Sequence, residues 1–244
     1  QEEAVSLRML DTESLSYIRE LLFHTNEERF IQLQIEAAVA TNDQKRATDL
    51  MLNFRRHFMD RNGDRFGLQL YSKLYKPSEF AENRLFGLGR NKEQMAAGML
   101  KYTRKPLHCS LTKGLPSAWE KLAPRLFKNL MGAMGDRQLQ YPNILAWEIV
   151  SKAFEMGDDL RNELYLQLIK QLTENPSIKS KHKGWGLMSL YLEIFPPGPG
   201  FSSFLELWIM RNAPADTCDI FLRALYAIQL GSAHPKPPSK SLVA

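Results

Sequence analysis

The sequence predicts an all-α protein, a compact bundle of about six core helices with an additional helical extension at its N-terminus. Apolar residues recur at intervals of three and four along most of the 244-residue chain, a spacing that places them on one face of a helix. No stretch alternates apolar and polar residues for long enough to form a half-buried strand. Prolines and glycines between the periodic segments mark where successive helices end.

Three helices are expected in the first part of the chain. The first can be capped by Asp11 or Thr12, and its apolar face is Leu15, Ile18, Leu21 and Leu22. The second, from about residue 27 to residue 40, has an apolar face of Phe30, Leu33 and Ala37. The third follows Asn42 or Asp43, and its apolar stripe is Ala47, Leu50, Met51, Phe54 and Phe58. It is expected to end in the turn 60–64, because Gly63 can adopt the positive φ of a helix stop.

Residues 66–98 are densely apolar at first, then break at Pro77 and form a loop marked by Gly87 and Gly89. The apolar faces of residues 1–98 need a partner, so we expect this helical extension to pack on the rest of the chain.

Prolines divide the second part of the chain into further helices. Pro116 opens a helix that reaches Met134, and Pro124 inside that span is expected to kink or split it. Pro142 opens the next helix. Two buried helices follow, with apolar faces of Leu160, Leu164, Leu168 and Leu172 in the first, and Trp185, Met188, Leu192 and Phe195 in the second. The last two helices span about 201–212 and 215–230, and residues 234–244 are expected to be extended or disordered.

One segment carries more information than its helical periodicity alone. It runs from Leu160 to Pro197 and reads LRNELYLQLIKQLTENPSIKSKHKGWGLMSLYLEIFPP. Its characteristic residues are Leu160, Arg161, Glu163, Tyr165, Gln167, Trp185, Phe195, Pro196 and Pro197. In these residues it resembles the signature of the myosin tail homology 4 (MyTH4) domain. The run MLKYTRKPL at 99–107 and the triplet Met134-Gly135-Asp136 also match, so the resemblance predicts a MyTH4 domain over about 99–240.

The MyTH4 domain is an all-helical, non-enzymatic module of unconventional myosin tails, of a plant calmodulin-binding kinesin and of some Rho GTPase-activating proteins. The resemblance therefore implies a binding part of a cytoplasmic, cytoskeleton-associated protein. Two departures stand out. Asn162 occupies a position where the family commonly has an aspartate. Family members that bind microtubules have basic side chains on the helix after the double proline, whereas this chain has Glu206 and only Arg211 there.

Composition limits the other classes of function. The net charge of +5 favours acidic partners but is too small to indicate nucleic-acid binding. No apolar run approaches the roughly 18 residues that cross a bilayer. Cys109 and Cys218 are far apart in sequence, and the five histidines lack metal-ligand spacing, so we expect no enzyme, metal or cofactor. The chain begins with Gln1 rather than Met, and we expect it to be part of a longer polypeptide.

Two basic clusters are candidates for partner binding. The first is expected as a loop between the two buried helices, together with one lysine before it: Lys170, Lys179, Lys181, His182 and Lys183. The second comprises Arg55, Arg56, Arg61 and Arg65. A solvated loop that carries charge without binding a partner is the simpler explanation of the first cluster, and salt screens each exposed contact. The signature residues are expected to be structural.

Three hypotheses for function follow. The favoured one is a module of a cytoskeletal motor or regulator that docks a protein partner, namely an acidic cargo or adaptor peptide. The second is direct microtubule binding, in which the basic residues contact the acidic tails of tubulin. The third is structural support for an adjacent FERM, RhoGAP or motor domain. The sequence leaves the oligomeric state and the identity of the partner open.

Overall fold

The computed structural model describes residues 26–82 and 96–231, and all regular structure within them is helical apart from one isolated bridge between Leu74 and Thr112. The helices are α2 (Asn26–Ala40), α3 (Gln44–Asn62), η1 (Gly63–Phe66), η2 (Leu68–Leu70), α4 (Pro77–Glu82), α6 (Ser117–Met134), α7 (Pro142–Glu155), α8 (Asp158–Leu172), α9 (Ile178–Ile194), α10 (Pro199–Asn212) and α11 (Cys218–Gln229). The all-α prediction is confirmed. The predicted helix at 12–22, the glycine loop at 87–89 and the tail at 234–244 lie outside the described residues.

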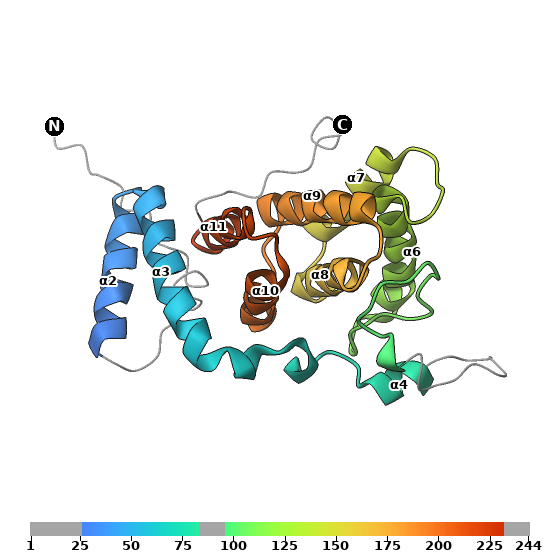
Figure 1. Cartoon of the computed structure of the whole chain (residues 1–244), viewed down its shortest axis with the longest axis horizontal. Helices are drawn as coiled ribbons and strands as arrows, with labels where there is room; N and C mark the ends of the chain where they lie inside the picture. Colours follow the sequence, from blue (N-terminus) through green and yellow to red (C-terminus); the bar gives the residue numbers. More distant parts are fainter. Residues whose placement is uncertain (1–25, 83–95, 232–244) are drawn as a thin grey trace.

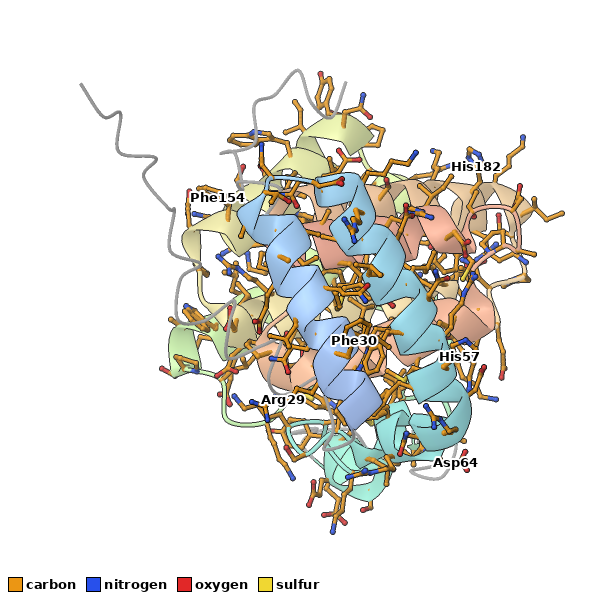
Figure 2. The ribbon with its side chains drawn as sticks, turned by 90° about the vertical axis from the view of Figure 1, so that its left-hand side faces the viewer. Arg29, Phe30, His57, Asp64, Phe154 and His182 are labelled. Carbon is orange, nitrogen blue, oxygen red and sulfur yellow. The ribbon has the colours of Figure 1, made fainter. Side chains whose placement is uncertain are left out.

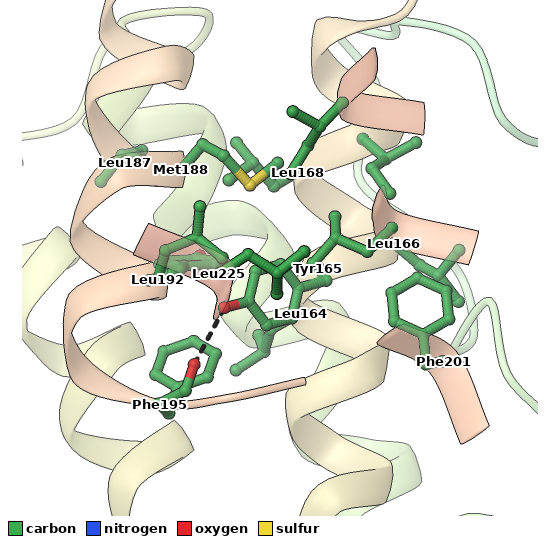
Figure 3. Packing of buried hydrophobic residues seen from close by; sticks show 14 of the residues in the cluster. Leu164, Tyr165, Leu166, Leu168, Leu187, Met188, Leu192, Phe195, Phe201 and Leu225 are labelled. Carbon is green, nitrogen blue, oxygen red and sulfur yellow. Dashed lines mark hydrogen bonds between the residues drawn. The ribbon is translucent and has the colours of Figure 1, made fainter. Parts of the chain in front are cut away.

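Helix α8 is the central helix of the bundle, with α6, α7, α9 and α10 around it (Figure 1). Every residue from Asn162 to Leu172 is buried, because neighbours cover this helix on all sides. Figure 3 shows the packing between α8 and α9, in which Leu164 and Leu168 lie close to Met188 and Leu192. The Tyr165 hydroxyl donates to the carbonyl of Phe195 at 2.9 Å, which ties α8 to the end of α9.

Helices α2 and α3 form a hairpin at one end of the molecule, where α3 also packs against α11 (Figures 1 and 2). Asp43 caps α3, since its carboxylate accepts a hydrogen bond from the Arg46 backbone N–H at 3.1 Å. The apolar stripe predicted for α3 is confirmed, with Ala47, Met51, Phe54 and Phe58 buried and Leu50 half-buried.

The apolar face predicted for α2 is wrong. Phe30 is 62% exposed and Leu33 is 56% exposed, whereas Ile35 and Ala38 are buried. The sequence of α2 offers two overlapping apolar stripes, and α2 packs mainly against α3, so that only one stripe can be covered.

Two predicted helix interruptions are confirmed only in part or not at all. The helix α3 ends at Asn62, within the predicted turn 60–64, but Gly63 has φ −56° and begins η1 instead of adopting a positive φ. Its missing side chain matters for packing, because a Cβ there would lie 3.1 Å from Leu207 Cδ1. Pro124 does not split α6, which runs from Ser117 to Met134 as one helix.

A buried ion pair joins the α2–α3 hairpin to the rest of the bundle. Arg55 of α3 and Glu206 of α10 are each only 1% exposed. Arg55 Nε lies 2.9 Å and 3.0 Å from the two Glu206 carboxylate oxygens, and the Tyr226 hydroxyl donates to Glu206 Oε1 at 2.7 Å. A second guanidinium nitrogen of Arg55 also contacts Glu206 and donates to Ser203 Oγ at 3.1 Å. The hairpin is therefore fixed to α10 and α11 by a hydrogen-bonded charge pair that solvent does not reach.

Candidate functional site

The sequence suggested that Lys170 is part of a surface basic patch. The structure shows instead that it is buried. The residue is buried in α8, and its Nζ donates to the carbonyl of Gly98 at 2.8 Å and to that of Lys101. Burial lowers the pKa of Lys170 to about 8. The lysine therefore holds the segment around residues 98–101 against α8 and is not available to a partner.

We expect the stability that Lys170 provides to increase with pH. Its pKa is about 8 in the folded protein and 10.5 for an ordinary lysine, so between these values the unfolded chain binds the proton and the folded protein does not. Raising the pH through this window should favour the folded protein by about 1.4 kcal/mol per pH unit. The measurement is urea unfolding of wild type and Lys170→Met across the window. A stability difference that does not change with pH would contradict the assignment.

The remaining residues of the first basic cluster lie on a helix rather than in a loop. Lys179, Lys181, His182 and Lys183 occupy the first two turns of α9, which Ser177 caps by accepting from the Ser180 backbone N–H. His182 projects from the edge of the molecule (Figure 2). Among the residues that the structure describes, none of these four forms an ion pair. Positive charge at a helix N-terminus is unfavourable, and the first turn of α9 contains no acidic residue to offset it. We call these four residues the basic turn.

An open groove of about 710 Å³ lies beside the basic turn, between α9 and the start of α11. Trp185 lines it and packs on Trp208 and Phe221, with ring centroids 5.4 Å and 5.0 Å away. Two isoleucines on opposite walls are unusually open to solvent: Ile178 of α9 is 79% exposed and Ile220 of α11 is 60% exposed. The full lining is Ile178, Lys181, His182, Trp185, Gly186, Ser189, Asn212, Pro214, Asp216, Thr217, Ile220 and Phe221.

Sequence reasoning missed this groove. The nearby Trp185 is half-buried, and its indole serves both the core and the groove wall. Only Lys181 and His182 of the groove lining were among the predicted binding residues. Ile178 and Ile220 belong to helices whose apolar stripes face inward, and nothing in their spacing distinguishes an exposed isoleucine from a buried one.

The second basic cluster is not a positive surface patch. Arg55 is buried against Glu206, and Arg56 pairs with Asp219 of α11. Arg61 is exposed, and its Nε donates to the carbonyl of His57 at 3.2 Å. Arg65 is exposed on η1. The two arginines that face the bundle are therefore engaged in attaching α3 to α10 and α11.

Glu163 supplies the carboxylate of the signature, and this carboxylate accepts several hydrogen bonds. It is fully buried and accepts from the backbone N–H groups of Leu111 and Thr112 at 2.8–3.0 Å, from the Thr112 hydroxyl at 2.8 Å and from Gln167 Nε2 at 2.9 Å. Burial raises the pKa of Glu163, while these hydrogen bonds act in the opposite direction. Its partners all belong to the protein, so its role in this structure is to hold the segment before α6 against α8.

Asn162, the neighbour of Glu163, also has a structural role. Its Oδ1 accepts from the Gly198 backbone N–H at 2.8 Å, and its Nδ2 lies 3.3 Å from the Tyr71 hydroxyl. Burial raises the pKa of Tyr71 to about 12, although the hydrogen bond from Asn162 opposes that shift. The asparagine therefore bridges the chain before α4 and the chain after the double proline without a charge.

The two cysteine thiols lie in environments that disfavour their thiolate forms. Burial raises the pKa of the Cys109 thiol to about 12 and also raises that of Cys218, so neither thiol is activated as a nucleophile. No group of three or more histidine, cysteine, aspartate or glutamate side chains is arranged to hold a metal ion in the part of the chain that the structure describes. None of the described helices is both long and apolar enough to cross a membrane.

Comparison with known proteins finds that the chain is similar in sequence to parts of several myosins. The sequence model of the MyTH4 domain matches residues 146–240, which ends where the resemblance predicts and begins later than residue 99. The High molecular weight form of myosin-1 of Acanthamoeba castellanii is 37% identical over 230 residues, covering 94% of this chain and 14% of that protein. Unconventional myosin heavy chain 6 of Caenorhabditis elegans is 38% identical over 86 residues, covering 34% of this chain and 4% of that protein. The chain thus spans a small part of these relatives.

Two solved structures share the fold. The MyTH4-FERM MF1 domain of Dictyostelium discoideum Myosin VII has a TM-score of 0.59 at 18% identity, covering 75% of this chain and 37% of that one. The human Myosin 7b C-terminal MyTH4-FERM domain, solved in complex with the harmonin-a PDZ3 domain, has a TM-score of 0.54 at 24% identity, covering 71% of this chain and 36% of that one. The match of the family model shows that the chain contains a MyTH4 domain at residues 146–240, and the solved structures share its fold.

Proposed function

We propose that this chain is a non-enzymatic protein-binding module of a cytoskeletal motor, and that it docks a cargo or adaptor protein in the groove between α9 and α11. In this proposal residues 99–240 form the MyTH4 domain, residues 1–98 form an extension packed on it, and the protein acts in the cytoplasm on the cytoskeleton. The similarity to myosin tails supports the motor context. The presence of a PDZ domain in the human Myosin 7b complex supports a protein as the kind of partner.

The observation on which the proposal depends is the open apolar groove beside uncompensated positive charge. Exposed large apolar side chains cost free energy in water, and two of them, Ile178 and Ile220, line this groove together with Trp185. Aromatic and apolar anchors surrounded by a charged rim are typical of protein-binding sites. A partner that covers Ile178 and Ile220 would remove that apolar surface from water.

Replacing Ile178 and Ile220 with serine is expected to weaken capture of the partner by about tenfold for each isoleucine, because each change removes an apolar anchor. Stability should stay within about 0.5 kcal/mol of wild type, since both side chains are exposed. The measurement is photo-cross-linking of the chain in cytosol, followed by quantitative recovery of each cross-linked protein.

The matched control is Ile144→Ser, which alters an exposed isoleucine on α7 that is not among the groove residues. It should leave recovery unchanged. If all cross-linked proteins are recovered equally with the groove variant and the control variant, the groove is not the docking site.

The basic turn supports direct microtubule binding as a second candidate function. Its exposed side chains could contact the acidic tails of tubulin, whereas α10 offers little for this purpose, because Glu206 is buried and Arg211 lies 3.9 Å from Asp64. Cosedimentation with microtubules should then fall steeply between low and physiological salt and be lost on reversal of Lys179, Lys181 and Lys183 to glutamate. The control replaces the exposed lysines Lys113, Lys121 and Lys128 with glutamate. It changes the net charge by the same amount outside the basic turn and should leave cosedimentation unchanged.

A further inference from the structure

Packing in the described part of the chain does not require a glycine at position 186. It lies in the middle of α9, where glycine destabilises a helix relative to alanine. A Cβ added there would meet no atom within 4 Å, so packing does not require the missing side chain. Gly184, two residues earlier, differs: its Cβ would lie 2.7 Å from side-chain atoms of both Leu172 and Met134. Gly186 lines the groove, so a side chain at this position would project into the open space of the groove.

A glycine on a helix face lets the backbone of another helix approach closely, because no side chain stands between them. The groove is walled by helices, and the described residues contain no sheet whose edge could pair with an added strand. The exposed isoleucines on the two walls suit apolar side chains spaced along one face of an inserted helix. The occupant best matched to this site is therefore helical.

The charged residues around the groove predict on which side of the bound helix its acidic residues should lie. The α9 wall has Lys181 and His182, with the rest of the basic turn beside them, whereas the opposite wall has Asp216. Acidic residues would be favourable on the flank that faces α9 and unfavourable on the flank that faces Asp216. Complementary charge thus distinguishes the two sides of the bound helix.

We propose that the groove binds one amphipathic α-helix of a partner protein, whose backbone crosses α9 at Gly186, whose apolar side chains contact Ile178 and Ile220, and whose flank toward α9 is acidic. This inference rests on the proposed protein-binding function and names the kind of segment that the site takes. An unstructured acidic tail, as on tubulin, would need the lysines but would have no use for Gly186 or the isoleucines.

The test is a selection of peptides of about 20 residues, roughly 30 Å long as a helix, from a random displayed library on the whole chain. The recovered peptides should combine helical apolar spacing with a surplus of acidic residues. Fluorescence anisotropy of a recovered synthetic peptide should show binding weakened at least about tenfold by Gly186→Leu, which places a side chain in the crossing point. Gly186→Leu should unfold no more easily than wild type, so that lost binding is not lost folding.

Gly200→Leu is the matched control, because Gly200 lies in the first turn of α10, has no atom within 4 Å of an added Cβ and is not part of the groove. It should leave peptide binding unchanged. Recovery of no peptide, or of peptides that bind Gly186→Leu as tightly as wild type, would overturn the inference. If cytosolic proteins still cross-link equally well to wild type and Gly186→Leu, the protein-binding function stands and the helix site falls. If selected peptides bind as expected but no cytosolic protein is captured, the site stands and the cargo function falls.

Discussion

Glu206→Gln is expected to destabilise the protein by about 3–5 kcal/mol, although glutamine has nearly the same shape as glutamate. The change leaves the Arg55 guanidinium buried without a counter-charge, since both side chains are only 1% exposed. It also weakens the acceptor for the Tyr226 hydroxyl. Urea unfolding followed by circular dichroism measures the loss, and hydrogen exchange in α3 should accelerate because the ion pair attaches α3 to α10.

The neighbouring pair of Arg56 and Asp219 provides the control for this prediction. It joins α3 to α11, but both of its side chains are more than 40% exposed. Arg56→Gln should therefore cost at most about 1 kcal/mol. The double variant Arg55→Met/Glu206→Met should recover much of the stability that Glu206→Gln loses, because it removes both buried charges. A Glu206→Gln variant as stable as Arg56→Gln would show that the buried pair is not an important attachment.

The position of a helix could be predicted from sequence where the helix is buried on all sides, because the prediction then does not depend on which face packs inward. Every residue of α8 from Asn162 onward is buried. The leucines at every fourth position and the residues between them therefore both indicate a central helix. The outermost helix is the opposite case. On α2 the stripe of Phe30 and Leu33 and the stripe of Ile35 and Ala38 have similar periodicity, and only the position of α3 decides between them.

The candidate site was less predictable, because the fate of a charged residue depends on partners distant in sequence. Arg55 resembles its neighbour Arg56 in the sequence, but its partner Glu206 lies 151 residues away along the chain. Lys170 likewise resembles the lysines of the basic turn, yet the carbonyls that it contacts belong to residues 98 and 101. Local pattern identifies positive charge, but only the packed structure shows which of those charges remain on the surface.

Replacing Glu163 with alanine is expected to cost about 4 kcal/mol of stability. Its carboxylate is the acceptor for the backbone N–H groups of Leu111 and Thr112, and each buried donor left without a partner costs about 1–3 kcal/mol. The Thr112 hydroxyl and Gln167 Nε2 would lose their acceptor as well. Urea unfolding gives the total, while hydrogen exchange of the Leu111 and Thr112 amides reports the local change.

Two further variants separate this effect from the general cost of losing a glutamate. Thr112→Val removes one donor and keeps the carboxylate, so it should cost only about 1 kcal/mol. Glu193→Ala changes an exposed glutamate at the surface of α9 and should stay within about 0.5 kcal/mol of wild type. If Glu163→Ala resembled Glu193→Ala, the segment before α6 would be held to α8 by its apolar residues instead. The large difference expected between them follows from one fact, that Glu163 supplies the acceptor for donors which water cannot reach.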